Sequence, residues 1–285
     1  MIGVDDRLTL VEHLTELRKR LFVSAASLVL GIIIAGVFNS FVFHLLLRPL
    51  PAKANRITTF SPSEPFLVSL KVWAYAGIIL ASPILLYEFW AFVAPAFSST
   101  TRRKTIGVVA LCAGLFLGGV VFGYYFVLPR GLSFLLGWNS DYFNVQNRAT
   151  DYFTFVAWFL VAFGAVFEMP VILVSAIRLG VIDVKFLRHN RKYAVLINAA
   201  IAAVATPSQD VFSMLAMLVP LLFLYEASIV VGHLMTRKRT KGGRSRKLKS
   251  ASAETDAPEE TVLALTEGAD DEAQREDDPD DASPA

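Results

Sequence analysis

Charged side chains are scarce over most of this 285-residue chain. Soluble globular proteins carry about 25% charged residues, whereas this sequence carries 18% and is 54% hydrophobic. The 49 residues from Arg237 onward hold 22 of the 52 charges, so the first 236 residues hold only 30. This distribution excludes a soluble enzyme and a nucleic-acid-binding domain. It favours a membrane protein with a polar tail.

Residue types that commonly perform chemistry are scarce as well. Cys112 is the only cysteine, which excludes a disulfide-stabilised scaffold. The four histidines lie in separate segments without metal-ligand spacing. The sequence contains none of the motifs H-E-x-x-H, G-x-S-x-G or G-x-x-x-x-G-K-S/T. We therefore predict that the protein is not an enzyme and uses no metal and no cofactor.

Long uncharged runs are what the sequence has instead. A spanning helix needs about 20 largely apolar residues, because the hydrocarbon core is about 30 Å thick and a helix rises about 1.5 Å per residue. We expect an all-α, polytopic membrane protein with six transmembrane helices, of which the fifth is barely long enough. The runs are 21–47, 72–87 (extended past Glu88), 105–129, 152–177 (interrupted by Glu168), 193–209 and 211–236.

Basic residues are unevenly shared between the two sides of this predicted topology. The N-terminus, the second and fourth loops and the tail up to Lys249 carry 20 lysines and arginines, whereas the first and third loops carry six. The positive-inside rule then places both termini in the cytoplasm and the protein in the cell membrane. The first apolar run is too long for the core of a cleavable signal peptide, so we expect an uncleaved first span.

Four regions follow from these patterns. We expect a cytoplasmic amphipathic segment at 1–20, a six-helix transmembrane domain at 21–236, a basic juxtamembrane segment at 237–249 and an acidic, disordered tail at 250–285. The basic segment anchors the topology and touches anionic membrane lipid; we expect no nucleic-acid partner.

The segment before the first span presents acids beside bases. Glu12, Glu16 and Arg20 share one helix face, because they follow one another at intervals of four residues. Leucines line the neighbouring stripe, which predicts a short amphipathic helix at the membrane interface. The acids either bind a ligand or pair with Arg20 and Lys19.

Two proline-containing stretches flank the second span. FSPSEPF (60–66) predicts a rigid external cap in which Glu64 is either a docking acid or a solvated one. In SPILLYEFWAFVAPAF (82–97), Pro83 and Pro95 predict a broken helix that enters the headgroup layer with its aromatic residues. Glu88 lies among them, either as a functional acid or as an interfacial carboxylate near Arg102 or Arg103.

The fourth span contains FGAVFEMP (163–170), which places Glu168 near the middle of the membrane. A carboxylate at that depth costs about 2.5 kcal/mol or more, so we expect it to face a cavity, water or a polar partner. Pro170 should loosen the preceding helical turn. The third span contains GLFLG (114–118) and GVVFG (119–123), whose small residues favour either internal helix packing or a subunit interface.

These stretches resemble the TatC family, the multi-spanning core subunit of the twin-arginine protein translocase. The similar segments are collinear from about residue 8 to 236: HLTELRKR (13–20), SPSEPF (61–66), YEFWAFVAPA (87–96), FGAVFEMPV (163–171), RKYAV (191–195) and TPSQD (206–210). The resemblance implies a concave, glove-like bundle with short fifth and sixth helices. It also implies a receptor that binds twin-arginine signal peptides of folded cargo at its cytoplasmic face and then recruits TatA-like and TatB-like single-span subunits. Transport by such systems is driven by the proton-motive force, and the receptor complex contains several copies of the core subunit, a homo-oligomer.

The resemblance also implies roles for particular residues. Glu16 is the family position for the signal arginines, but Thr101 stands where a second acid is common, so we assign the missing charge to Glu88 or Glu12. The other implied positions are the recognition surface at Arg18, Phe92, Pro95, Arg102 and Arg103, the membrane-embedded partner contact at Glu168, Pro170, Tyr225 and Glu226, and the periplasmic cap at Pro49, Pro62, Glu64, Pro65 and Phe66.

Two other functions compete with this interpretation. A proton-coupled secondary transporter of a small solute could use Glu168 as its proton site. A purely structural membrane subunit is the other alternative. A small-solute transporter has no need of an acid-bearing amphipathic helix beside an aromatic, proline-bracketed loop, and the translocase is therefore favoured.

Overall fold

A computed structural model describes residues 10–51, 57–93, 102–138, 146–206 and 210–255. The chain divides into a unit of residues 1–232 and a second unit of residues 233–285. The second unit contains the end of the last helix. The boundary between spans and tail at 236 stays a prediction.

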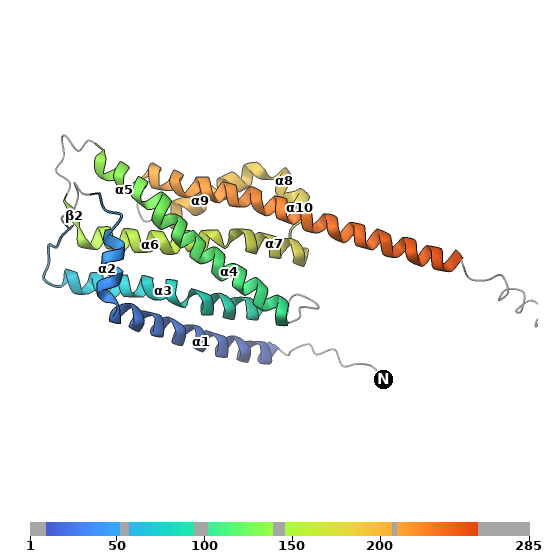
Figure 1. Cartoon of the computed structure of the whole chain (residues 1–285), viewed down its shortest axis with the longest axis horizontal. Helices are drawn as coiled ribbons and strands as arrows, with labels where there is room; N and C mark the ends of the chain where they lie inside the picture. Colours follow the sequence, from blue (N-terminus) through green and yellow to red (C-terminus); the bar gives the residue numbers. More distant parts are fainter. Residues whose placement is uncertain (1–9, 52–56, 94–101, 139–145, 207–209, 256–285) are drawn as a thin grey trace, which may run out of the picture. The chain divides into compact units, whose positions relative to one another are not determined.

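The described chain is almost entirely helical (Figure 1). Its elements in chain order are α1 (Leu10–Val37), α2 (Asn39–Leu47), β1 (Ile57–Thr58), α3 (Glu64–Val93), α4 (Arg102–Phe122), the π-helical turn η3 (Gly123–Val127), α5 (Leu128–Gly137), β2 (Asn147–Arg148), α6 (Ala149–Phe167), α7 (Met169–Leu179), α8 (Val184–His189), α9 (Arg191–Ala205) and α10 (Val211–Thr255).

Five helical segments in the described chain are long and apolar enough to cross a membrane. They are 14–37, 64–93, 106–137, 149–179 and 211–234. The predicted fifth span corresponds to α9, which has 15 residues. A helix of that length rises about 22 Å, less than the hydrocarbon thickness of about 30 Å. The polytopic, all-helical class is therefore confirmed, and the sixth span stays a prediction.

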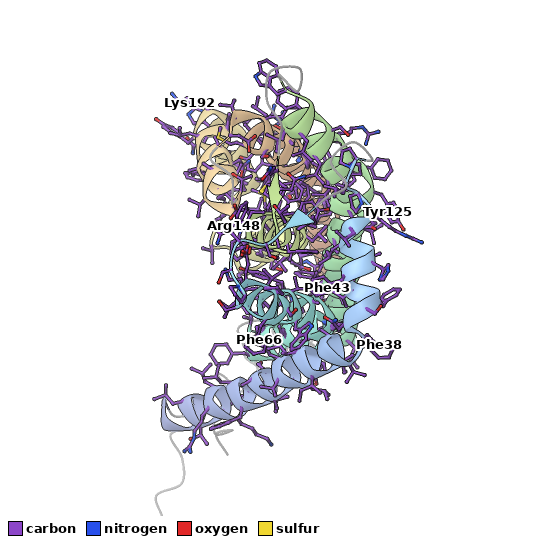
Figure 2. All side chains as sticks on the ribbon, turned by 90° about the vertical axis from the view of Figure 1, so that its left-hand side faces the viewer. Phe38, Phe43, Phe66, Tyr125, Arg148 and Lys192 are labelled. Atoms are coloured by element: carbon purple, nitrogen blue, oxygen red, sulfur yellow. The ribbon has the colours of Figure 1, made fainter. Side chains whose placement is uncertain are left out.

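The surface of these helices is apolar where lipid would meet it. Phe38, Phe66 and Tyr125 project outward (Figure 2), and each is about 60% exposed. Large exposed apolar surfaces are rare on soluble monomers, whereas the hydrocarbon of a bilayer solvates them without penalty. The outward-facing phenylalanine and tyrosine rings thus fit membrane helices.

Helix α1 is continuous through the predicted boundary at residue 20. From Leu10 onward, where the described chain begins, the structure therefore shows no separate interfacial helix before the first span. Helix α1 packs against α3. The two backbones approach closely where Gly31 faces Gly77, since a Cβ built on Gly31 would lie 2.6 Å from the Gly77 carbonyl oxygen. Only glycine allows this approach.

Helix α6 lies at the centre of the main apolar core and packs against α3 and α4. Small residues again set the spacing, because Gly119 lies against the Phe163 carbonyl and Gly164 against the Phe116 ring. A Cβ on Gly114 or Gly118, by contrast, would meet no atom within 4 Å. The glycines of GVVFG thus serve internal packing, whereas the two glycines of GLFLG face open space in the described chain.

Two tyrosines close the end of α2. Pro49 has no N–H, so it cannot bond to the Leu45 carbonyl one turn earlier. The Tyr124 hydroxyl donates to Leu45 O and the Tyr152 hydroxyl to Leu46 O, each at 2.8 Å. Helix α2 is therefore joined to the third and fourth spans by hydrogen bonds that replace its missing helical ones.

The prediction that Pro83 breaks the second span was wrong. Helix α3 runs through Pro83 to Val93. Pro83 leaves the Ile79 carbonyl without its usual partner, and the hydroxyl of the buried Ser82 donates to that oxygen at 2.8 Å. In an apolar bilayer this substitute bond lets the helix continue.

Candidate functional site

Two acids from distant parts of the chain meet at one arginine. Glu16 and Arg20 lie one turn apart on α1, and Arg20 contacts Glu16 through both Nε and Nη2. Its Nη1 donates to Glu88 Oε2 on α3 at 3.0 Å. The alignment of α1 along α3 thus brings both acids to one guanidinium, and we call these three residues the Glu16–Arg20–Glu88 cluster.

The Glu16–Arg20–Glu88 cluster is partly shielded from solvent. The side chains of Arg20, Glu16 and Glu88 are 22%, 31% and 12% exposed. Ion pairs in such surroundings are stronger than fully exposed ones, because less water screens them. Of the two alternatives for Glu16, pairing with Arg20 is what the structure shows. Glu88 also pairs with Arg20, 68 residues away in sequence.

The other predicted recognition residues surround the Glu16–Arg20–Glu88 cluster only in part. Arg18 is exposed, with its guanidinium 5.7 Å from the centre of the Phe22 ring, and Phe92 is half-buried near the end of α3. Pro95 and Thr101 lie outside the described residues. The backbones of Glu12, Arg102 and Arg103 belong to the first turns of α1 and α4.

Glu168 occupies a break between helices, as the proline pattern predicted. Helix α6 ends at Phe167 and α7 begins at Met169, with Pro170 in its first turn. Glu168 is only 6% exposed, and its Oε1 has no hydrogen-bond partner among the described residues. The carboxyl group lies close to the thiol of the buried Cys112 and to the backbone of Phe116, both on α4. The carboxyl group is therefore enclosed by protein, with one acceptor atom left over.

Tyr225 and Glu226 join α10 to its neighbours. The hydroxyl of the buried Tyr225 donates to Leu187 O of α8 at 2.9 Å. Glu226 Oε2 accepts from Arg191 of α9 at 3.0 Å, and both side chains are about half exposed. Tyr225 thus serves internal packing, whereas Glu226 remains reachable from outside.

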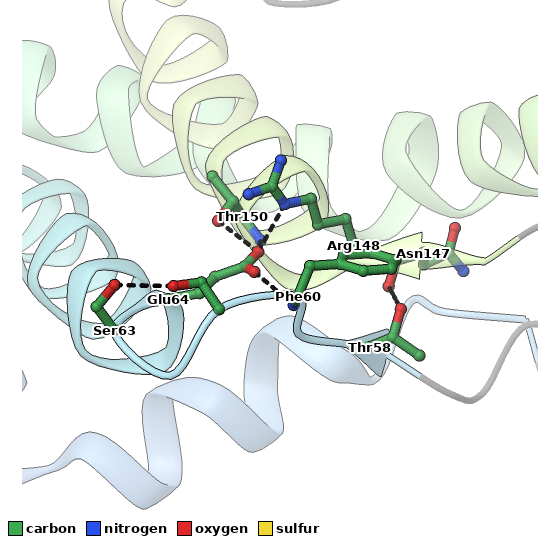
Figure 3. A network of polar contacts seen from close by, with 8 residues as sticks. Thr58, Phe60, Ser63, Glu64, Asn147, Arg148 and Thr150 are labelled. Atoms are coloured by element: carbon green, nitrogen blue, oxygen red, sulfur yellow. Dashed lines mark hydrogen bonds and ion pairs between the residues drawn. The ribbon is translucent and has the colours of Figure 1, made fainter.

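A second polar network surrounds Glu64 (Figure 3). Glu64 is 4% exposed and accepts four hydrogen bonds: from Phe60 N, Arg148 Nε, Thr150 N and Thr150 Oγ1, at 2.7–3.2 Å. Beside it β1 pairs in parallel with β2. Both sequence-based alternatives for Glu64 were wrong, because it is neither solvated nor available for docking. It fixes the loop before α3 to the loop before α6.

The remaining cap residues differ in exposure. Pro62, Pro65 and Phe66 are exposed, and Pro49 is half-buried at the end of α2. Sequence reasoning missed Arg148 and Thr150, since nothing in the third loop marks them as partners of Glu64. It also missed Asn198, which is 1% exposed in α9 with neither amide atom hydrogen-bonded to a described residue. The sequence did contain a signal for Asn198, because it is a single amide side chain within an apolar run.

In the described part of the chain, no three His, Cys, Asp or Glu side chains gather closely enough to hold a metal ion. The polar groups are instead arranged as ion pairs at helix ends and as single buried groups within spans.

The comparison with protein families agrees with this arrangement. Residues 12–220 match the family model of the Sec-independent protein translocase protein, TatC. The chain belongs to the TatC family. The matched range contains the Glu16–Arg20–Glu88 cluster, the Glu64 network and Glu168.

Individual TatC proteins are similar over nearly their whole length. The protein from Carboxydothermus hydrogenoformans is 37% identical over 240 residues, which cover 84% of this chain and 99% of the relative. The one from Aquifex aeolicus is 39% identical over 238 residues, covering 81% and 97%. A crystal structure described as the twin arginine translocase receptor TatC superposes with a TM-score of 0.71 at 38% identity, covering 78% of this chain and 99% of that one. As a TatC-family member, this chain is a multi-pass membrane component of twin-arginine protein export.

Proposed function

We propose that this protein is the signal-peptide receptor of its twin-arginine translocase, and that Glu16 and Glu88 hold the signal arginines. The observation that supports this most directly is the Glu16–Arg20–Glu88 cluster. Two carboxylates from α1 and α3 already hold one guanidinium through three N–H groups. Carboxylates suit guanidinium groups because the planar fork of donors matches their oxygens.

Glu88 supplies the second carboxylate, in place of the acid that is common in the family at the position of Thr101. It lies on α3, across from Glu16, and is the less exposed of the two acids. A partly buried carboxylate binds a cation more strongly than an exposed one, because screening is weaker. Arg18 and Phe92 lie on the same two helices and complete the recognition surface.

Glu168 is proposed to contact the single-span partner subunits. It is buried near the middle of a candidate span and has one unbonded oxygen among the described residues. A polar side chain of a partner helix would bond to that oxygen once the packing that encloses Glu168 opens, and in an apolar environment the contact would be strong. The exposed Glu226 marks the edge along which TatA-like and TatB-like helices dock. Movement of cargo is then driven by the proton-motive force, and several copies of the chain assemble in one receptor complex.

The topology is part of the same proposal. With six spans, of which α9 is the short fifth, both termini lie on the cytoplasmic side of the cell membrane. A short span is accommodated by local thinning of the bilayer at modest cost. The basic segment 237–249 contacts anionic lipid on that side.

Photo-crosslinking tests the receptor role. A photoreactive residue at position 17 or 92 should label a twin-arginine signal peptide in native membranes and leave a twin-lysine peptide unlabelled. Glu16→Gln and Glu88→Gln should each reduce labelling, whereas Asp183→Asn, which removes an exposed acid at the start of α8, should not. Equal labelling of the two peptides would refute the receptor role and favour the small-solute transporter.

A further inference from the structure

The connection between α7 and α9, residues 178–193, packs beside the apolar part of α10 (Figure 1). Val184 and Leu187 of α8 lie in one buried cluster with Tyr225 and Ile229. The Tyr225 hydroxyl also donates to Leu187 O at 2.9 Å. Both α10 residues belong to the candidate span 211–234. A segment fixed to the side of an apolar span lies at the bilayer surface rather than out in the aqueous phase.

The outer side of this α7–α9 connection is rich in bases. It contains five lysines and arginines but a single acid, Asp183. Among the described residues only Arg191 has an ion-pair partner, Glu226 of α10. The other four bases are exposed: Arg178, Lys185, Arg188 and Lys192. Lys192 projects outward at the edge of the bundle (Figure 2). Cations held at a bilayer surface attract anionic headgroups.

Large apolar side chains are exposed among these bases. Val181 is 74% exposed, Phe186 is 62% exposed and Tyr193 is 54% exposed. In α8 the buried residues face α10, so Lys185 and Phe186 lie on its outward side. Apolar groups beside bases suit a bilayer surface, where the rings enter the acyl region and the long basic side chains reach the headgroups.

We propose that the α7–α9 connection is a binding surface for anionic phospholipid. Val181 and Phe186 insert among the acyl chains, and Lys185 and Arg188 contact the phosphates. This inference does not depend on the receptor function.

Charge complementarity identifies the occupant. Every phospholipid carries a phosphate, but a zwitterionic headgroup also brings a cation, which an excess of bases over acids repels. A lipid with a net negative charge is therefore favoured over a zwitterionic one. A soluble acidic protein would match the bases, but it would leave the exposed apolar side chains beside an apolar span unexplained.

Bound lipid would also hold the short helix α9 in place. Helix α9 begins at Arg191, inside the connection, and has 15 residues. Anionic lipid at the neighbouring bases fixes this end of α9 at the headgroup layer. A helix too short to cross the hydrocarbon core without strain gains most from such an anchor.

The test measures which lipids lie next to α8 in the full chain. Phe186→Cys, with Cys112 replaced by serine, carries a bimane fluorophore in phosphatidylcholine nanodiscs. Quenching by dibrominated phosphatidylglycerol is compared with quenching by dibrominated phosphatidylcholine at the same mole fraction. The comparison gives the relative binding constant of the two lipids at that position. A bimane at Val204→Cys is the matched control, because Val204 is 84% exposed on α9 but lies outside the connection.

We expect phosphatidylglycerol to be favoured at position 186 by at least about fivefold, the effect of one base near anionic headgroups, and by nothing at position 204. Lys185→Gln combined with Arg188→Gln should bring the ratio at position 186 close to one. Lys71→Gln, which removes an exposed base of α3, should leave it unchanged.

Three results would overturn the proposal. Equal quenching by the two lipids at position 186 would show that the surface does not select charge. No quenching by either lipid would place α8 in water and favour a soluble acidic partner. A preference that persists in the Lys185→Gln, Arg188→Gln double variant would mean that other bases hold the lipid. Quenching at position 204 in every variant confirms that the bundle is inserted, so each of these results is informative.

Discussion

The close approach of α1 and α3 at Gly31 and Gly77 gives the sharpest structural prediction. In Gly31→Ala the new Cβ would lie 2.6 Å from the Gly77 carbonyl oxygen, and Gly77 belongs to the backbone of a packed helix. An ordinary contact is about 3.5 Å, so the helices must separate by about 1 Å at this point. Forced overpacking of this kind typically costs about 1–3 kcal/mol, which is about a 5- to 150-fold change in the folding equilibrium.

Gly36→Ala is the matched control. Gly36 is on the same helix and faces the same partner, but its Cβ would meet the Trp73 ring at 3.6 Å, an ordinary contact. Reversible unfolding in mixed micelles measures the free energy of unfolding of both variants. Spin labels at positions 17 and 89 measure the α1–α3 distance at the Arg20 end, about 16 Å along the helix from Gly31. We expect lower stability and a larger distance in Gly31→Ala alone.

A Gly31→Ala variant as stable as Gly36→Ala, with an unchanged distance, would refute this reasoning. It would mean that the lack of side chains at Gly31 and Gly77 is not what allows the two backbones to pack so closely. The Glu16–Arg20–Glu88 cluster would then have to be positioned by other contacts between the helices.

Three further outcomes follow from the packing and hydrogen bonds. Ser82→Ala should lower the free energy of unfolding by about 1–2 kcal/mol, because the Ile79 carbonyl, which Pro83 leaves without a backbone donor, then loses the Ser82 hydroxyl as well. Chemical unfolding in micelles measures this free energy. Glu64→Ala should reduce the thermal unfolding midpoint of the full chain far more than Asp151→Asn, since Glu64 accepts four hydrogen bonds and Asp151 is an exposed acid at the start of α6. Equal midpoints for the two variants would contradict the role of Glu64 in joining the two loops. Gly119→Ala should impair assembly of the bundle, measured as monodisperse yield, whereas Gly118→Ala should not, because only the first would strike a backbone carbonyl.

The break at Glu168 illustrates what local chemistry can predict. Proline lacks an N–H and disfavours a helical conformation in the residue before it, so FEMP marks an interruption wherever the sequence occurs. The same rule failed at Pro83. There a serine hydroxyl one residue earlier donates to the freed carbonyl, and only the rotamer of Ser82 decides whether it can do so.

Sequence patterns could not predict hydrogen bonds and ion pairs between residues that are far apart in the chain. The spacing of Glu16 and Arg20 predicts their pairing, because both lie on one helix face. Nothing in the sequence pairs Arg20 with Glu88, because that contact depends on the alignment of two helices packed through glycine. For the same reason Glu64 was interpreted as a docking or solvated acid, although Arg148 of β2 and Thr150 at the start of α6, more than 80 residues away, both bond to it.

The sequence by itself determined the class of the protein, its apolar segments and its family, since these depend on composition, on run length and on local motifs. Membrane-spanning helices satisfy their backbone hydrogen bonds internally, so hydropathy alone reveals them. The tertiary structure alone decided which polar groups meet. Each such group is rare and isolated within an apolar chain, and its partner is set by helix packing at glycines and by the pairing of loops, which no one-dimensional pattern encodes.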